Sequence, residues 1–348
     1  MRVMNESPFA AYAFHATTDD GRPVVVMAVQ GTFAVQTGEP MRAAADQVPV
    51  WCQDVYRGAE HASGLRHANA AVVYRPRSDV IVNAVAHAPF GYPTVEWSVD
   101  LRVGRLHRQV VVRGPHLWLH TAGGGWKRER PAPVVSVPIR NELAFGGAWV
   151  LGGRAVLEPR NPIGTGYLPD GIPTSQPIAA PQVVALNEPD HLAGARYIPR
   201  GFAAVPWYFA PRSAMLENGA DAERRPRGRL GPEPYSRFNA AHPDLRYPGY
   251  LVGNEPVVLS HCRPGGGDVR TALPGVAVCG LLELPRGGLR ALKMRLDSFE
   301  LDVESPDPAE HRAFLVWRGL FPLDLGVQCV ALTATRLPDD AAETRRVA

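Results

Sequence analysis

Runs of β-branched side chains and alternating apolar and polar positions dominate residues 1–135 and predict β-strands. Thr94 to Val103 (TVEWSVDLRV) alternates with a period of two, which is typical of a strand with one buried face. Valine-rich runs predict further strands at Arg22 to Val35, Ala70 to Tyr74 and Val80 to His87, and a pair of strands within Arg108 to His120. Turn residues separate these runs at short intervals, as they do in β-sandwiches and barrels.

Strand patterns return in the C-terminal third of the chain. Apolar runs predict strands at Tyr250 to Cys262, Gly275 to Leu284 and Arg312 to Leu323. Leu289 to Val303 (LRALKMRLDSFELDV) fits two patterns, because its leucines recur at helical spacing while its end (FELDV) alternates like a strand. We favour two strands there over one helix.

The middle of the chain has a different character. From Pro159 to Pro248 prolines recur every few residues and no hydrophobic period persists. A structureless loop of that length is uncommon in a compact domain. We therefore expect this segment to wrap over the sheets, with short turns and one helical piece near Ser213 to Asn218.

These patterns predict a mainly β protein of two packed sandwich-like or barrel-like domains, with a long Pro/Gly-rich wrapping segment between strand-rich ends. The expected N-terminal β domain covers residues 1–135, and the Pro/Gly-rich segment covers 136–248. The C-terminal β-rich part covers 249–337 and packs with the preceding segment. Residues 338–348 are expected to form a flexible tail.

The composition supports this fold class and excludes a helical bundle. The chain has 348 residues, 45% of them hydrophobic and 20% charged, which is enough for a sizeable core. Its 34 glycines and 34 prolines favour short elements, because proline removes a helix hydrogen bond and glycine destabilises helix interiors. A net charge of +3 is small for a nucleic-acid-binding protein, so we expect no nucleic-acid partner.

The sequence predicts a cytoplasmic protein without membrane insertion. No apolar run reaches the ~18 to 20 residues of a membrane helix. Met1 to Ala16 lacks the apolar stretch and the cleavage site of a signal peptide. The four cysteines are dispersed and form no CxxC pair, which favours free thiols in a reducing compartment.

Two pairs of reactive side chains invite a chemical interpretation. His116 and His120 flank a tryptophan in HLWLH, but on a strand they would lie roughly 13 Å apart, too far for one zinc ion. His261 and Cys262 are neighbours, and neighbouring strand residues point to opposite faces, which argues against a nucleophile–base pair. We therefore expect no catalytic residue, no metal and no cofactor.

The Pro-rich middle contains a charged cluster, Glu223 to Arg229 (ERRPRGR). It has two interpretations, a patch that binds an anion or a partner protein and a solvated loop. We favour the solvated loop, because surface loops commonly have this composition.

Five short segments, here named the motif segments, combine glycine, proline, asparagine and aromatic residues. They are RNELAFGG (Arg140 to Gly147), RNPIGTG (Arg160 to Gly166), PRGFAAVPW (Pro199 to Trp207), YSRFNAAHP (Tyr235 to Pro243) and the strand entry from Gly249 to Pro256. Such mixtures can fix an extended segment on a sheet without regular secondary structure.

In their order and spacing the motif segments resemble a bacterial family of domains of unknown function that is often encoded beside type VI secretion genes or fused to pentapeptide repeats. Its Phe-Gly-Gly, Asn-Pro-x-Gly-x-Gly, Gly-Phe with downstream Trp, Arg-Phe-x-x-Ala-x-Pro-Asp and Leu-x-Gly-Asp-Glu patterns are all represented, with Asn254 where aspartate is usual. The resemblance spans roughly Val24 to Gly280. The matching residues, taken as candidates for interaction, are Phe145, Gly146, Gly147, Asn161, Pro162, Gly164, Gly166, Phe202, Trp207, Arg237, Phe238, Asn239, Asp244 and Glu255.

The resemblance implies an adaptor or chaperone that binds a cargo effector and couples it to the spike-tip protein of the secretion machine by non-covalent contacts. The family has no established catalytic residues. This chain departs from the family pattern between Trp207 and Tyr235, and at Val184 to Pro189 in place of a Leu-Pro-Asn-Ile segment. If that region contacts the cargo, these departures imply a different effector.

The residue types are compatible with a binding protein, and two alternatives remain. An enzyme that processes carbohydrates or small molecules would need two carboxylates, such as Asp244 and Glu255, about 5 to 10 Å apart across a cleft. A structural module of a larger assembly is the other alternative. Five side chains belong to the types that anchor protein interfaces, and they are Trp207, Tyr208, Tyr235, Tyr250 and Arg237.

Overall fold

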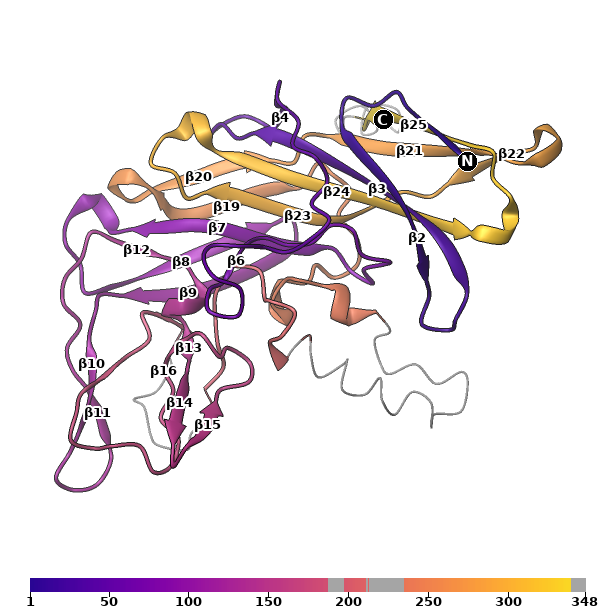
Figure 1. The fold of residues 1–348 in the computed structure, drawn as a ribbon. Helices are drawn as coiled ribbons and strands as arrows, with labels where there is room; N and C mark the ends of the chain where they lie inside the picture. Colours follow the sequence, from indigo (N-terminus) through magenta and orange to yellow (C-terminus); the bar gives the residue numbers. More distant parts are fainter. Residues whose placement is uncertain (187–196, 211, 213–234, 339–348) are drawn as a thin grey trace.

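The chain forms a mainly β structure, which confirms the predicted fold class. The computed structural model describes residues 1–186, 197–210, 212 and 235–338. Within these residues, strands of several sheets pack around a shared interior and short 3-10 helices and turns connect them (Figure 1).

The largest sheet has seven strands and draws them from both ends of the chain. The strands β23 (Arg295–Val303) and β24 (Arg312–Pro322) lie in its middle, between β7 (Asp79–His87) and β3 (Pro23–Ala34). β23 runs parallel to β7, and β24 runs antiparallel to β3 along its whole length. The order is β12 (Ser136–Pro138), β7 (Asp79–His87), β23 (Arg295–Val303), β24 (Arg312–Pro322), β3 (Pro23–Ala34) and β2 (Ala10–Thr17), with β4 (Arg42–Ala43) paired to β3.

Two further sheets complete the body of the molecule. The five-stranded sheet has the order β18 (Val183–Val184), β9 (Leu106–Arg113), β8 (Glu96–Val103), β19 (Pro256–Arg263) and β20 (Gly267–Ala272). The four-stranded sheet has the order β1 (Arg2–Asn5), β25 (Cys329–Arg336), β21 (Val276–Glu283) and β22 (Leu289–Leu292). Because β8 pairs with β19 and β7 pairs with β23, the changes in sequence character near residues 135 and 248 mark no boundary between sheets.

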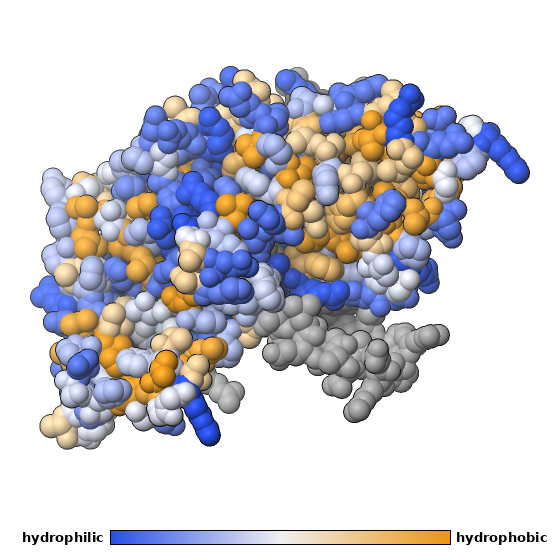
Figure 2. Space-filling view, in the orientation of Figure 1, coloured by the Kyte–Doolittle hydropathy of each residue, from blue (hydrophilic) through white to orange (hydrophobic). Residues whose placement is uncertain are grey.

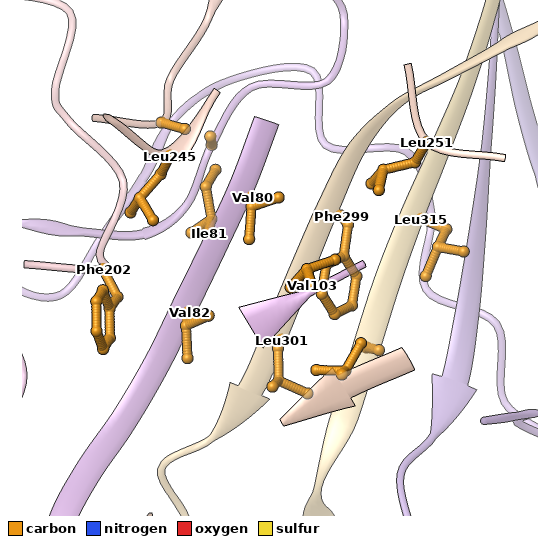
Figure 3. Close-up of a cluster of buried hydrophobic side chains, with 14 of the residues drawn as sticks. Val80, Ile81, Val82, Val103, Phe202, Leu245, Leu251, Phe299, Leu301 and Leu315 are labelled. Atoms are coloured by element: carbon orange, nitrogen blue, oxygen red, sulfur yellow. The ribbon is translucent and has the colours of Figure 1, made fainter. Parts of the chain in front are cut away.

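The three sheets enclose one hydrophobic core, to which the Pro-rich middle also contributes. Figure 3 shows Phe202 and Leu245 beside Ile81 and Val82 of β7. Both side chains from the middle are 1% exposed. The middle segment therefore inserts side chains into the core as well as covering the sheets.

A smaller lobe, here named the distal lobe, projects from the body at the lower left of Figure 1. It consists of the three-stranded sheet β11 (Trp126–Arg128), β10 (Leu117–His120) and β17 (Ile178–Ala179), the hairpin of β14 (Ala148–Leu151) and β15 (Arg154–Leu157), and the parallel pair β13 (Phe145–Gly146) and β16 (Thr165–Gly166). Its own small core contains Trp118, Trp126, Leu168, Ile172 and Ala180.

Most predicted strands are confirmed, and one is wrong. Leu289 to Val303 forms two strands, β22 and β23, rather than a helix. Ala70 to Tyr74 forms no strand. Its backbone carbonyls instead accept hydrogen bonds from a side chain, because Arg318 Nη1 lies 2.7 Å from the oxygens of both Ala70 and Val72. The expected helical piece at 213–218, the charged cluster at 223–229 and residues 339–348 of the expected tail lie outside the described residues.

One face of β23 is polar and yet buried. Phe299 and Leu301 point into the core, so Glu300, Asp302 and the following Glu304 share the opposite face. This face meets the hairpin of β5 (Val55–Tyr56) and β6 (Leu65–His67), where His67 Nδ1 lies 2.5 Å from Glu300 Oε1. We name these acidic side chains of β23 and their partners the polar layer.

Three arginines from elsewhere in the sequence neutralise the polar layer. Arg57 Nη1 and Arg140 Nε donate to Glu304 over 2.6 and 2.8 Å, and Arg66 pairs with Asp302. Although burial raises the pKa of Glu304, the hydrogen bonds from Arg57 and Arg140 hold it below its usual value. Pairing of this kind is what allows charged side chains to be buried.

Because Phe202 belongs to the main core, we predict that Phe202→Ala lowers the free energy of unfolding of the whole body by about 3 to 5 kcal/mol. Denaturant unfolding followed by tryptophan fluorescence and circular dichroism measures this. Phe90→Ala, at a side chain 86% exposed, serves as the control and should change the free energy by less than about 0.5 kcal/mol. A separate early transition confined to one probe would contradict a shared core.

Candidate functional site

Four of the five motif segments meet where the distal lobe joins the body. β13 and β16 pair in parallel, which brings the first two segments together. Asn141 Nδ2 donates to the carbonyl of Ala204 over 2.7 Å, and the backbone N–H of Val205 donates to Ala240 over the same distance. Segments far apart in the sequence therefore form one structural unit, which we name the motif cluster.

Asn161 is the central residue of the first two segments. It is 1% exposed, and its Nδ2 donates to the carbonyls of Asn141 and Phe145 over 2.7 and 3.0 Å. Its own carbonyl accepts the N–H of Gly147 over 2.9 Å. Phe145 is buried beside the ring of Tyr197. Asn161 therefore fixes both segments through their backbone.

The glycines of these two segments make room for Asn161. A Cβ at Gly146 would lie 2.1 Å from the Asn161 carbonyl oxygen, and the φ of +153° is one that other residues rarely adopt. A Cβ at Gly164 would lie 2.4 Å from Asn161 Nδ2. Pro162 is half-buried next to Asn161, and Gly166 ends β16 against Pro181. Close packing explains these small residues.

Asn239 and Asp79 join the fourth segment to the main sheet. Asn239 is fully buried, and its Nδ2 donates to Asp79 Oδ1 over 2.8 Å and to the carbonyl of Arg77 over 2.9 Å. The other Asp79 oxygen accepts the N–H of Ala240 over 2.7 Å. Arg75 Nε lies 3.4 Å from Asp79 and donates to the carbonyl of Phe238. The fourth segment is therefore held by side chains of the body.

Arg212 and Arg237 continue this pattern. Arg212 is buried and donates to the carbonyls of Val205 and Arg237 over 2.8 and 3.1 Å, which ties the third segment to the fourth. The Arg237 guanidinium pairs with Asp19 and lies 4.5 Å from the centre of the half-buried Phe238 ring. Arg237 therefore attaches the turn after β2 to the motif cluster.

Among the aromatic candidates, one lies at the surface and two bind backbone groups of the protein through their hydroxyls. Trp207 is 42% exposed and meets the rings of His61 and Tyr208 edge-on. The Tyr235 hydroxyl accepts the N–H of Asp19, and the Tyr250 hydroxyl donates to the carbonyl of Arg75. Trp207 is therefore the aromatic candidate with the most surface to offer a partner.

The two candidate carboxylates have different surroundings. Glu255 is buried, and its oxygens accept the N–H groups of Val252 and Gly253 over 2.7 and 2.9 Å. Asp244 is half-exposed, pairs with Arg200 and lines a pocket. Glu255 does not line that pocket within the described residues, so the two do not form an acid–base pair across it.

The pocket, here named the motif pocket, lies within the motif cluster and has a volume of about 230 Å³. Polar side chains of Asn141, Arg160, Arg200, His242 and Asp244 line it. Ile198, Ala203, Val205 and Phe209 supply apolar walls. Among the described lining residues there is no serine, threonine, cysteine or lysine.

His242 joins two segments at the edge of the motif pocket. Its Nδ1 accepts the N–H of Asp244 over 3.3 Å, and its ring also hydrogen-bonds the backbone of Pro199. Burial above all, and then the charges of Arg200 and Arg246, lower the pKa of His242 to about 4. The ring is therefore neutral at pH 7.

The two pairs of reactive side chains noted in the sequence, His116 with His120 and His261 with Cys262, do not form a common reactive site in the described chain. His116 is buried with Nδ1 2.9 Å from the carbonyl oxygen of Gly114. His261 Nδ1 lies 2.9 Å from the Gly266 oxygen, and burial raises the pKa of the Cys262 thiol. No group of three or more metal-ligating side chains occurs among the residues described.

Several residues of the site were missed from the sequence. Arg160, His242 and Arg212 lie in or near the motif segments, but nothing in a local pattern distinguishes a buried arginine or histidine from an exposed one. Asp79 could have been identified from the sequence, since it is a charged residue at the start of the apolar run of β7. A carboxylate there predicts a buried partner.

The comparisons with known proteins identify a family. A family described as "Uncharacterized protein conserved in bacteria (DUF2169)" matches residues 20–318, which include all five motif segments. No curated protein and no solved structure matches the chain. No helix in the part of the chain that the structure describes has the length and apolarity needed to cross a membrane.

We predict that Gly164→Ala lowers the free energy of unfolding by about 1 to 3 kcal/mol, because the new Cβ would lie within 2.8 Å of Asn161 Nδ2, the Ala144 oxygen and the Gly146 Cα. Chemical denaturation measures the change. Gly123→Ala is the matched control, since a Cβ there would meet nothing within 4 Å. Equal stability of the two variants would show that the close packing around Asn161 is not needed.

The lowered pKa of His242 predicts a pH dependence of stability. Between the unfolded value near 6.5 and the folded value of about 4, the unfolded chain binds a proton that the folded chain does not. Acidification through this range should therefore cost up to about 3 kcal/mol of unfolding free energy through His242.

Unfolding free energies measured from pH 7 to pH 4 test this expectation. His242→Gln should fall less steeply than the unmodified protein, whereas the exposed His120→Gln should follow it. A His242→Gln profile parallel to that of the unmodified protein would contradict a His242 that stays neutral in the folded protein.

Proposed function

The chain belongs to the bacterial DUF2169 family, and we propose that it acts in the cytoplasm as an adaptor that binds a type VI secretion effector and couples it to the spike tip. The proposal combines the resemblance of the motif segments with the character of the motif cluster. It involves protein–protein contacts and no catalysis.

The observation that carries the proposal is that apolar side chains are exposed on segments whose backbone is fixed although it has no regular secondary structure. Buried asparagine and arginine side chains fix the backbone of the motif segments, while Ile198 and Trp207 remain 48% and 42% exposed. An aromatic side chain that is already ordered loses little entropy when it binds, which favours affinity. Tryptophan is also among the residues most enriched at interface hot spots.

The distal lobe adds a second apolar surface. Figure 2 shows hydrophobic residues gathered over the region of β14 and β15. On this hairpin Val150 is 76% exposed and Leu157 is 41% exposed. Large exposed aliphatic side chains grouped in this way mark surfaces that bind other proteins. Two such surfaces suit an adaptor, which must bind both a cargo and a carrier.

We predict that the protein, purified with a tag from a bacterium that expresses its secretion genes, carries a toxin-like effector in a stoichiometric complex. Identification by mass spectrometry and the mass of the intact complex measure this. Trp207→Ala should reduce the recovered effector at least about tenfold, because truncating a hot-spot residue costs about 2 kcal/mol or more and each 1.4 kcal/mol is a factor of ten in affinity.

Tyr92→Ala is the control, because Tyr92 is an exposed aromatic residue outside the motif segments. It should recover as much effector as the unmodified protein. A monomer without effector or spike-tip protein, isolated while the secretion machine is assembled, would contradict the adaptor function. So would unchanged effector export from a strain that lacks this protein.

A further inference from the structure

Two polar groups among the lining residues of the motif pocket make no hydrogen bond to any described residue of the protein. Arg160 donates through Nε and Nη2 to both oxygens of Glu158 and through Nη2 to the carbonyl of Tyr197. Its Nη1 has no hydrogen-bond partner among the described residues. Asn141 donates through Nδ2 to Ala204, and its Oδ1 accepts no hydrogen bond from the described chain. The Nη1 group of Arg160 and the amide oxygen of Asn141 are therefore available to a ligand of the pocket.

The charges around the pocket favour an anionic ligand. Arg160 and Arg200 line it and pair with the carboxylates of Glu158 and Asp244. The charges of Arg246 and Arg108 also act on His242 and add positive potential. His242 itself is neutral at pH 7. A carboxylate group fits this balance, because a hydrogen bond from a guanidinium N–H to a carboxylate is charge-assisted and roughly twice as strong as a neutral one.

The size and walls of the pocket limit the ligand to a single residue. Pockets that enclose whole small molecules usually measure about 300 to 1000 Å³, whereas this one measures about 230 Å³. The side chains of Ile198, Val205 and Phe209 form its apolar part. The occupant must therefore combine an anionic group with a short apolar side chain.

We propose that the motif pocket binds the C-terminal residue of a partner polypeptide. The terminal carboxylate pairs with Arg160 and Arg200, and the backbone N–H of the last residue donates to Asn141 Oδ1. Gly201, whose Cβ position would lie 4.0 Å from Asn141 Oδ1, leaves room for that backbone. An acidic side chain supplies a carboxylate without an adjacent N–H donor, so the chain terminus is the better match.

This inference rests on the proposed adaptor function, since it names the part of the partner that the motif pocket recognises. The test uses the full chain and a fluorescein-labelled hexapeptide that ends in Ala-Leu with a free carboxylate. Fluorescence anisotropy should show saturable binding. The same peptide with a C-terminal amide should bind at least about tenfold more weakly, because it lacks the charge that Arg160 and Arg200 would bind.

Variants of the exposed pocket residues distinguish recognition from a structural effect. Ile198→Asp places a carboxylate at the wall and should weaken binding at least about tenfold. Leu289→Asp, the same kind of change at an exposed aliphatic residue of β22, should leave binding unchanged. Asp244→Asn removes a carboxylate that pairs with Arg200 and would repel the terminal carboxylate, so it should strengthen binding several-fold.

Three results would overturn the inference. Equal binding of the acid and the amide would remove the carboxylate from recognition. Equal binding of a peptide amide that ends in Glu would assign the pocket to an acidic side chain. Absence of binding by every peptide would leave the pocket without this role, while stoichiometric recovery of the effector by the same protein would still support the adaptor function.

Discussion

Hydrogen bonds from buried side chains to loop backbone hold this molecule in its shape. A segment without regular structure leaves its N–H and C=O groups unpaired, and each unpaired group that is buried costs about 1 to 3 kcal/mol. Asn161, Asn239 and Arg212 provide the missing partners for the motif segments. Asp79 does the same from the main sheet through the N–H of Ala240, and Glu304 of the polar layer binds the side chain of Arg140. The described residues of the Pro-rich middle are consequently held in place although the strands β16, β17 and β18 there have only two residues each.

The sequence predicted the strands well because side-chain alternation is a local property. The alternation in β23 correctly placed Phe299 and Leu301 on one face. It could not show what the other face meets, since Glu300 contacts Asn83, 217 positions away in the sequence. The β-branched run at 70–74 was misread for the same reason, because Arg318, from a distant strand, binds its backbone.

The candidate residues of the site could be found from the sequence, but their roles could not. Glycine and asparagine in the motif segments indicated fixed backbone, and the structure shows them buried in that role. Trp207 stands in the same kind of sequence and lies at the surface. Burial depends on the whole fold, so local patterns cannot separate residues that fix the backbone of the motif cluster from residues that face a partner. On the adaptor proposal, the buried residues of the motif cluster can stay constant while the exposed side chains vary with the cargo.

The placement of β23 and β24 in the middle of the main sheet has a consequence for how the protein emerges from the ribosome. β3 and β7 are synthesised early, yet the strands that separate them are encoded more than 200 positions after β7. Until Pro322 has left the exit tunnel, the edges of both early strands lack their final neighbours. Long-range strand pairing of this kind folds slowly and exposes unpaired edges that aggregate. The nascent chain should therefore depend on cellular folding helpers until its synthesis is nearly complete.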